Sequence, residues 1–139
     1  MAIGFEVDKY WYPVGPMGAG DYLYSFFSTI AYHLEKGKWG SRFPAVMGPL
    51  YQGELQQQYI ERAMDELRVV QRELKQFSPK QVIWSFEDLS QQPPWGDDIS
   101  ENVTDLSNYY VTCEGEDLIG VLLAALDHAK ELKQNLYIG

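Results

Sequence analysis

Three stretches of the chain place apolar residues at helical spacing. In residues 21–37 the apolar positions follow the i, i+3, i+4, i+7, i+8, i+11 pattern of one helix face, after Asp21 as the N-cap. Residues 54–76 repeat the pattern with charged residues opposite or alongside, and a third apolar stripe follows Gly115. The sequence therefore predicts three helices, of which the first ends near Gly37.

Three other stretches are rich in β-branched and aromatic residues and predict strands: residues 1–12, 81–86 and 108–113. Tyr137 and Ile138 remain as a short tail or an edge strand. Between these elements, prolines and glycines interrupt the chain and predict loops. These loops cover residues 13–20, 38–53 and 91–98.

The order β, α, α, β, β, α predicts a single α+β domain over residues 1–139. About three helices are expected to pack on one face of a small, mostly antiparallel sheet. A chain of 139 residues can bury one core without a disulfide or a metal. The two consecutive helices after the first strand could also form a crossover, so the direction and the order of the strands stay open.

The charge is concentrated in one part of the chain. Twenty acids and eleven bases give a formal net charge of −9. Nine of the acids and no lysine or arginine lie between Glu87 and Asp117, which we call the acidic segment, whereas the remainder holds eleven charges of each sign. An acidic surface repels phosphate, so neither nucleic acid nor an anionic membrane is expected as a partner. The charge favours a cationic partner instead.

Candidate chemistry in the chain is sparse. The acids near Asp97 do not follow the spacing of a calcium loop, and one cysteine with two histidines excludes the usual zinc ligand sets, so we expect no metal and no cofactor. Glu87 and Asp88 could act as a general acid and base, but neighbours on a strand point to opposite faces. Cys113 is predicted to be a buried structural thiol. No familiar nucleophile or phosphate-binding motif occurs, so we expect no enzymatic activity.

Several longer strings of residues are unusual in composition. They are WGSRFP at 39–44, LYQG at 50–53, WSFEDLS at 84–90, PPWG at 93–96 and TDLSNYY at 104–110. In these strings the chain resembles the immunity protein 70 family of bacterial polymorphic toxin systems, over nearly its whole length. The resemblance implies a cytosolic antidote encoded beside a secreted toxin. It supplies no catalytic residues and names no single toxin.

The charge and the resemblance together predict a non-enzymatic immunity protein that binds and neutralises a cognate, basic toxin. Clustered carboxylates can stand in for phosphate, and aromatic residues in loops can anchor an interface. The predicted partner-binding residues are Glu87, Asp88, Trp95, Asp97, Asp98, Glu101, Asp105 and Trp39.

Two alternatives stay open. One is a small enzyme that uses carboxylates of residues 87–105 on a cationic or sugar substrate, and the other is an adaptor whose acidic face binds another basic protein. A toxin gene immediately upstream would favour immunity, and a metabolic operon would favour the enzyme. The chain has no long apolar run and no basic and apolar N-terminal signal, so we expect a cytoplasmic protein; its oligomeric state is not predicted.

Overall fold

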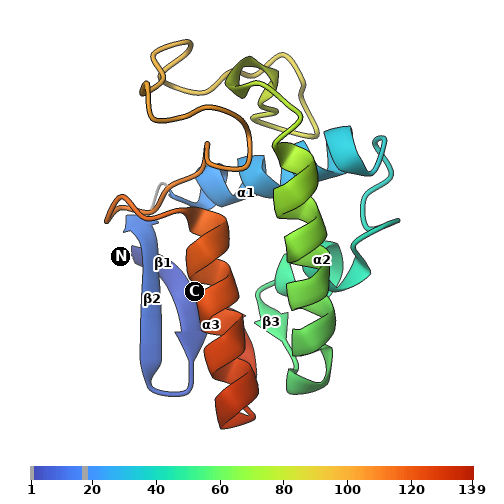
Figure 1. Cartoon of the computed structure of the whole chain (residues 1–139), viewed down its shortest axis with the longest axis vertical. Helices are drawn as coiled ribbons and strands as arrows, with labels where there is room; N and C mark the ends of the chain where they lie inside the picture. The colour runs from blue at the N-terminus through green and yellow to red at the C-terminus, as the bar shows by residue number, and fades with distance from the viewer. Residues whose placement is uncertain (1, 17–18) are drawn as a thin grey trace.

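The computed structural model describes residues 2–16 and 19–139, and within them the chain forms a four-stranded antiparallel sheet with helices (Figure 1). The strand order is β2-β1-β4-β3. The strands are β1 (Ala2–Val7), β2 (Tyr10–Pro16), β3 (Glu54–Leu55) and β4 (Leu136–Ile138). The α-helices are α1 (Ala19–Thr29), α2 (Ile60–Leu74) and α3 (Leu118–Leu132). The predicted α+β class with a mostly antiparallel sheet is therefore confirmed.

Four shorter helical pieces complete the described elements. A π-helical turn, η1 (Ile30–Leu34), continues α1 and ends three residues before the predicted end near Gly37. A second π-helical turn, η2 (Val46–Leu50), lies in the predicted loop 38–53, and the 3₁₀ turns η3 (Gln57–Tyr59) and η4 (Pro79–Gln81) flank α2. The second predicted helix was extended too far towards the N-terminus, because residues 54–59 form β3 and η3 before α2 begins.

The N-terminal strand prediction was wrong in its length, because residues 2–16 form a hairpin. Asp8 adopts a left-handed conformation, with φ of 54°, and the chain turns back there. The hairpin register places Trp11 beside Glu6. A Cβ atom at Gly4 would lie only 2.5 Å from Nε1 of Trp11, so glycine at this position lets the indole lie on β1.

The C-terminal residues form an inner strand, which corrects the prediction of a tail or an edge strand. Tyr137 in β4 pairs with Glu6 in β1 on one side and with Glu54 in β3 on the other. Two further strand predictions were wrong. Residues 81–86 form no strand, and residues 108–113 contribute only an isolated bridge between Val111 and Asp117.

The helices pack on one face of the sheet, as predicted. α2 and α3 run side by side, α3 contacts β1, β2 and β4, and α1 crosses near one end of α2 and α3 (Figure 1). Phe5 and Val7 point into this core, whereas Glu6, Trp11 and Tyr137 are exposed. Most of residues 82–117, which contain the acidic segment, lie beyond α1, at the end where α1 crosses α2 and α3 (Figure 1). The last part of the segment runs back to β2, where the N–H of Cys113 bonds to the carbonyl of Val14 at 2.8 Å, and then to the start of α3.

Candidate partner-binding site

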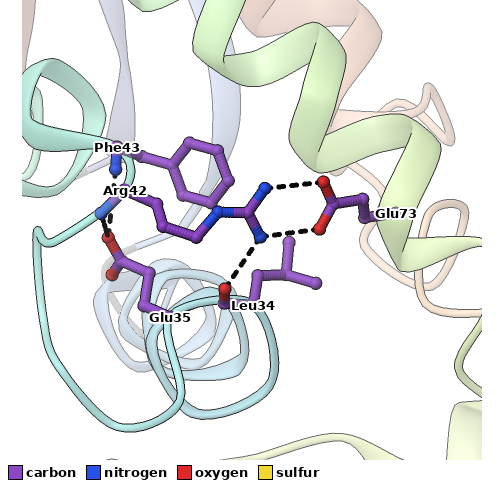
Figure 2. Close-up of polar contacts among 5 residues, drawn as sticks. All are labelled: Leu34, Glu35, Arg42, Phe43 and Glu73. Atoms are coloured by element: carbon purple, nitrogen blue, oxygen red, sulfur yellow. Dashed lines mark hydrogen bonds and ion pairs between the residues drawn. The ribbon is translucent and has the colours of Figure 1, made fainter.

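The loop that carries Trp39 is held in place by carboxylates (Figure 2). Glu35 is 2 % exposed and accepts hydrogen bonds from the backbone N–H groups of Gly40, Arg42 and Phe43, at 2.9, 3.0 and 3.1 Å. The Arg42 guanidinium donates to both oxygens of Glu73 at 2.7 Å and to the carbonyl of Leu34 at 2.9 Å. These bonds tie the loop to the end of η1 and to α2.

A second buried carboxylate fixes the other half of this loop. Glu66 in α2 accepts hydrogen bonds from the backbone N–H groups of Ala45 and Val46, at 3.3 and 2.9 Å, and from Nε of Arg62 at 3.2 Å. A carboxylate placed at unpaired N–H groups satisfies backbone donors that a helical turn leaves free. The chain around η2 is therefore anchored to α2.

Trp39 lies half-buried inside an aromatic cluster. Its indole Nε1–H donates to the carbonyl of Met47 at 2.7 Å, and its ring contacts Tyr24, Tyr51 and Phe86, with centroids 4.9 to 6.3 Å away. The indole N–H, which is the polar group that Trp39 could offer to a partner, is therefore already bonded within the protein. Trp39 supports the loop, and only part of its ring faces solvent.

The irregular segment that follows α2 is held on α1 by hydroxyl groups. The hydroxyls of Ser25 and Thr29 donate to the carbonyl of Ile83 at 2.8 and 3.2 Å, and Thr29 accepts from the N–H of Ile83 at 3.1 Å. The N–H of Phe86 donates to the hydroxyl of Ser28 at 3.1 Å. These side chains satisfy backbone groups that a strand would have paired, which explains why an apolar, β-branched run forms no strand here.

The far end of the same segment is tied to α1 through tyrosines. The hydroxyl of Tyr110, which is fully buried, lies 2.9 Å from that of Ser25 and 2.8 Å from that of Thr29. The hydroxyl of Tyr22 accepts from the N–H of Val111 at 2.8 Å and donates to the carbonyl of Tyr109 at 3.2 Å. Burial raises the pKa of Tyr22 to about 12, so this hydroxyl keeps its proton at neutral pH.

A cleft of about 500 Å³ opens between β2, the start of α1 and the irregular segment. We call it the aromatic cleft, because Tyr22, Trp84, Trp95 and Tyr109 line it. The rings of Trp84 and Trp95 meet edge to face at 5.3 Å, and Nε1–H of Trp95 donates to the hydroxyl of Tyr109 at 2.8 Å. Trp95 remains 39 % exposed, so a fixed aromatic surface faces solvent.

Three acids of the acidic segment are engaged by their own neighbours. Ser90 donates to Asp88 through its backbone and hydroxyl, which lowers the pKa of Asp88. Burial opposes the ionisation of Asp105, but hydrogen bonds from Ser107 and Thr104 outweigh it and lower the pKa. Asp117 caps α3 by accepting from Gly120 N–H at 3.1 Å, and burial raises its pKa.

The other six acids of the segment are exposed, and none of their carboxylates has a hydrogen-bond or ion-pair partner in the described part of the chain. They are Glu87, Asp97, Asp98, Glu101, Glu114 and Glu116. The ion pairs found among the described residues lie elsewhere, on α2, α3 and the loop before η2. The acidic segment therefore presents uncompensated negative charge to solvent.

The structure divides the predicted binding residues into groups. Trp95 and Asp98 line the aromatic cleft, and Asp97 lies in the turn between them, which the Asp98 N–H closes on the carbonyl of Trp95 at 3.0 Å. Glu87 lies on the other flank, near Tyr51 and the Trp39 cluster, where its charge contributes after burial and Tyr24 to a raised pKa of Tyr51.

Other candidate residues occupy different surroundings. Asp105 sits near the end of α2, where the N–H of Leu106 bonds to the carbonyl of Phe77. Cys113 is exposed and lines the aromatic cleft, which corrects the prediction of a buried thiol. Hydrogen bonds from Ser90 lower the pKa of Asp88, which makes Asp88 less suited to act as the general acid of the enzyme alternative. No group of three or more His, Cys, Asp or Glu residues among the described ones could hold a metal ion.

Of the aromatic and acidic residues that line the cleft, the predicted binding residues include Trp95 and Asp98 but miss Asp21, Tyr22, Trp84 and Tyr109. Asp21 was predicted as an N-cap, which was wrong because α1 begins at Ala19 and Asp21 lies in its first turn. Trp84 was interpreted as a strand residue and as part of the string WSFEDLS. The one available signal was Tyr22, an aromatic residue that falls outside the apolar stripe of its helix.

No helix of residues 2–16 and 19–139 has the length and apolar composition needed to cross a bilayer.

With this geometry in view, comparison with protein families defines the class of the molecule as an immunity protein. The family model of immunity protein 70 matches residues 5–138, nearly the whole chain. The chain belongs to the immunity protein 70 family. Comparison with curated proteins and with solved structures gave no match.

Proposed function

We propose that this immunity protein binds a cognate toxin and neutralises it through the surface formed by the aromatic cleft and the nearby carboxylates of the acidic segment. Family membership supports the class of function. The single observation that carries the location is the set of six exposed carboxylates without partners in the described residues, of which Asp97 and Asp98 lie in the turn that follows the fixed and exposed Trp95.

The physical argument begins with charge. All of the excess negative charge of the chain lies between Glu87 and Asp117, and it acts over a Debye length of roughly 10 Å at 0.1 M ionic strength. Such a field accelerates association with a basic partner and makes the rate fall as salt rises. Screening by lysine or arginine within the segment is absent because the segment contains neither.

Rigidity supports the same surface. The acidic segment has no regular helix or strand, yet hydroxyls of α1 bind the backbone of Ile83 and Phe86 directly before it, and Tyr110 within it is anchored in the core. A surface that is already ordered loses little conformational entropy when a partner binds. Trp95 is held by its bond to Tyr109 and supplies the exposed aromatic area that hot spots commonly use.

On this proposal the protein acts by occupation and not by catalysis. Carboxylates placed in a cation-rich active site stand in for phosphate or another anionic substrate and block access to it. The residues expected to contribute directly are Trp95, Asp97, Asp98 and Glu101, whereas Asp88 and Asp105 shape the segment through their bonds to Ser90 and Ser107. Trp39 and Glu87 form a separate flank of the surface.

The test uses the toxin domain encoded by the neighbouring gene. A triple variant, Asp97→Asn, Asp98→Asn and Glu101→Gln, removes three charges from the cleft side. The control variant, Glu54→Gln, Asp127→Asn and Glu131→Gln, removes three exposed charges elsewhere. We expect the first variant to associate at least about tenfold more slowly at low salt, with a weaker salt dependence, and the control to change far less.

Each outcome decides the proposal. An equal decrease of the association rate in both triple variants would mean that only the net charge of the protein matters, and it would reject the assigned surface. Unchanged affinity and salt dependence in a folded cleft-side variant would also reject it, and Trp39 would then be examined next. Turnover that Glu87→Gln abolishes in a folded protein would favour the enzyme alternative. Binding of an unrelated basic protein with no toxin binding would favour the adaptor alternative.

A further inference from the structure

The aromatic cleft combines three features that recognise one kind of side chain. Four aromatic residues line it, two carboxylates lie on it, from Asp21 and Asp98, and none of its described lining residues is lysine or arginine. Resting on the proposed function, we infer that this cleft receives an arginine side chain of the toxin. The guanidinium stacks against the indole of Trp95 and pairs with Asp98.

The geometry explains why the two recognition elements stay together. The N–H of Asp98 donates to the carbonyl of Trp95 at 3.0 Å, so the turn carries the carboxylate close to the indole. The indole itself is fixed by Tyr109 and by edge-to-face contact with Trp84 and Tyr22, at 5.3 and 5.8 Å. An incoming cation therefore meets a preformed site.

The chemistry of the walls selects arginine over lysine. Val14, Ile99, Val103 and Val111 make much of the cleft apolar. A guanidinium is planar and weakly hydrated and stacks on aromatic rings, whereas an ammonium is compact and strongly hydrated and loses more on leaving water. The stem of arginine packs against the apolar wall while its head reaches a carboxylate. A volume of about 500 Å³ accommodates the whole side chain.

The carboxylates of the cleft are available for this role. Neither Asp21 nor Asp98 has a side-chain hydrogen bond or ion pair with another described residue, and both are exposed. They lie on different elements, Asp21 in the first turn of α1 and Asp98 in the turn after Trp95. Asp127, an exposed acid of α3, does not line the cleft and provides a control.

The experiment is a titration of the isolated protein with arginine blocked at both ends as its N-acetyl methylamide, followed by NMR of the indole N–H groups. The chain has four tryptophans, of which Trp84 and Trp95 line the cleft while Trp11 and Trp39 lie elsewhere. We expect saturable shifts of the first two only. Blocked citrulline, which has the same shape without the charge, should bind about tenfold more weakly, and blocked lysine should fall between them.

Variants sharpen the test. Asp98→Asn should weaken binding of blocked arginine by about threefold or more, whereas Asp127→Asn should leave it unchanged. Equal binding of citrulline, equal loss in both variants, or equal shifts of all four tryptophans would overturn the inference.

The outcomes remain distinct from those of the proposed function. Toxin binding without any arginine-induced shift would reject the cleft ligand and leave the function standing. Arginine binding in the cleft without toxin binding would reject the function and retain a guanidinium site.

Discussion

The loop around Trp39 and the acidic segment differ in the side chains that hold their irregular backbone in place. Both are interrupted by proline and glycine, and both must satisfy backbone groups without a long helix or strand. At the loop, carboxylates of neighbouring elements point toward its backbone. Glu35, directly after η1, and Glu66, in α2, accept backbone N–H groups of the loop, and Glu73 in α2 pairs with Arg42. In residues 82–117, hydroxyls of α1 bind the backbone, and most carboxylates stay outside.

The difference shows what each kind of anchor leaves free. A buried carboxylate accepts hydrogen bonds from several donors at once. Its charge must be compensated by those donors, so it adds no negative charge to the protein surface. A hydroxyl is neutral, so it holds a backbone group without altering the charge of the region. The acidic segment is therefore both fixed and strongly negative. The loop is also held in place, but the carboxylates that hold it are paired with backbone N–H groups and with Arg42.

The largest effect is expected in the loop. Glu35→Ala removes the acceptor of three backbone N–H groups, at Gly40, Arg42 and Phe43. A buried donor that loses its partner costs about 1 to 3 kcal/mol, so we expect the free energy of unfolding to fall by about 3 kcal/mol or more in urea denaturation. Glu35→Gln retains one acceptor oxygen and should lose less.

The matched control for this comparison lies in the acidic segment. Glu101→Ala removes an exposed carboxylate that has no partner among the described residues, and its effect should stay within about 0.5 kcal/mol. Similar losses at Glu35 and Glu101 would contradict the distinction between inward and outward carboxylates.

A smaller effect is expected where the acidic segment meets α1. Tyr110→Phe keeps the buried ring but removes the hydroxyl that lies against Ser25 and Thr29. Those two side chains retain their bonds to Ile83, so the expected loss of stability is about 1 to 2 kcal/mol. Urea denaturation would measure it, with faster amide hydrogen exchange expected at Ile83. Tyr32→Phe, at an exposed ring, is the control and should change neither quantity.

The stability that the Arg42–Glu73 pair contributes should depend only modestly on pH, and it should be lost only as the solution becomes acidic. The hydrogen bond from Arg42 lowers the pKa of Glu73 below its ordinary 4.5. The folded state therefore prefers the ionised form: the stabilisation is complete above the unfolded pKa and is lost as pH falls through the lower, folded pKa. Because Arg42 is 43 % exposed, solvent screening limits the pair to about 1 kcal/mol or less.

Urea denaturation across acidic pH would test this. Glu73→Gln should reduce stability at neutral pH and flatten the acid limb, while Glu131→Gln, at an exposed site, should leave the limb as it is. An unchanged acid limb in the Glu73 variant would refute the role assigned to this pair.

The smallest effect on stability is expected from the charges at the aromatic cleft. Neutralising Asp97, Asp98 and Glu101 together relieves repulsion and breaks no bond between described residues. Stability should rise by up to about 0.5 kcal/mol at low salt, and the gain should vanish at high salt. A clear loss of stability would show that these carboxylates support the fold, contrary to the comparison with the loop.

The sequence by itself determined the α+β class, the three α-helices and the location of the charge. Helical periodicity is a local signal, because an apolar stripe can only be buried against a neighbour, and α2 and α3 follow their stripes closely. The concentration of nine acids between Glu87 and Asp117 is likewise a property of the chain alone. Local similarity of several strings also sufficed to indicate the immunity protein 70 family.

Only the tertiary structure decided which extended segments become strands and which residues form the site. Tyr137 lies in an inner strand because β1 and β3 both need a partner there, whereas residues 81–86 form none because hydroxyls of α1 already satisfy Ile83 and Phe86. Tyr22 and Trp95 are 73 positions apart in the sequence, yet they meet at one cleft. Pairing of strands and assembly of a cleft depend on distant partners, and a local pattern carries no information about them.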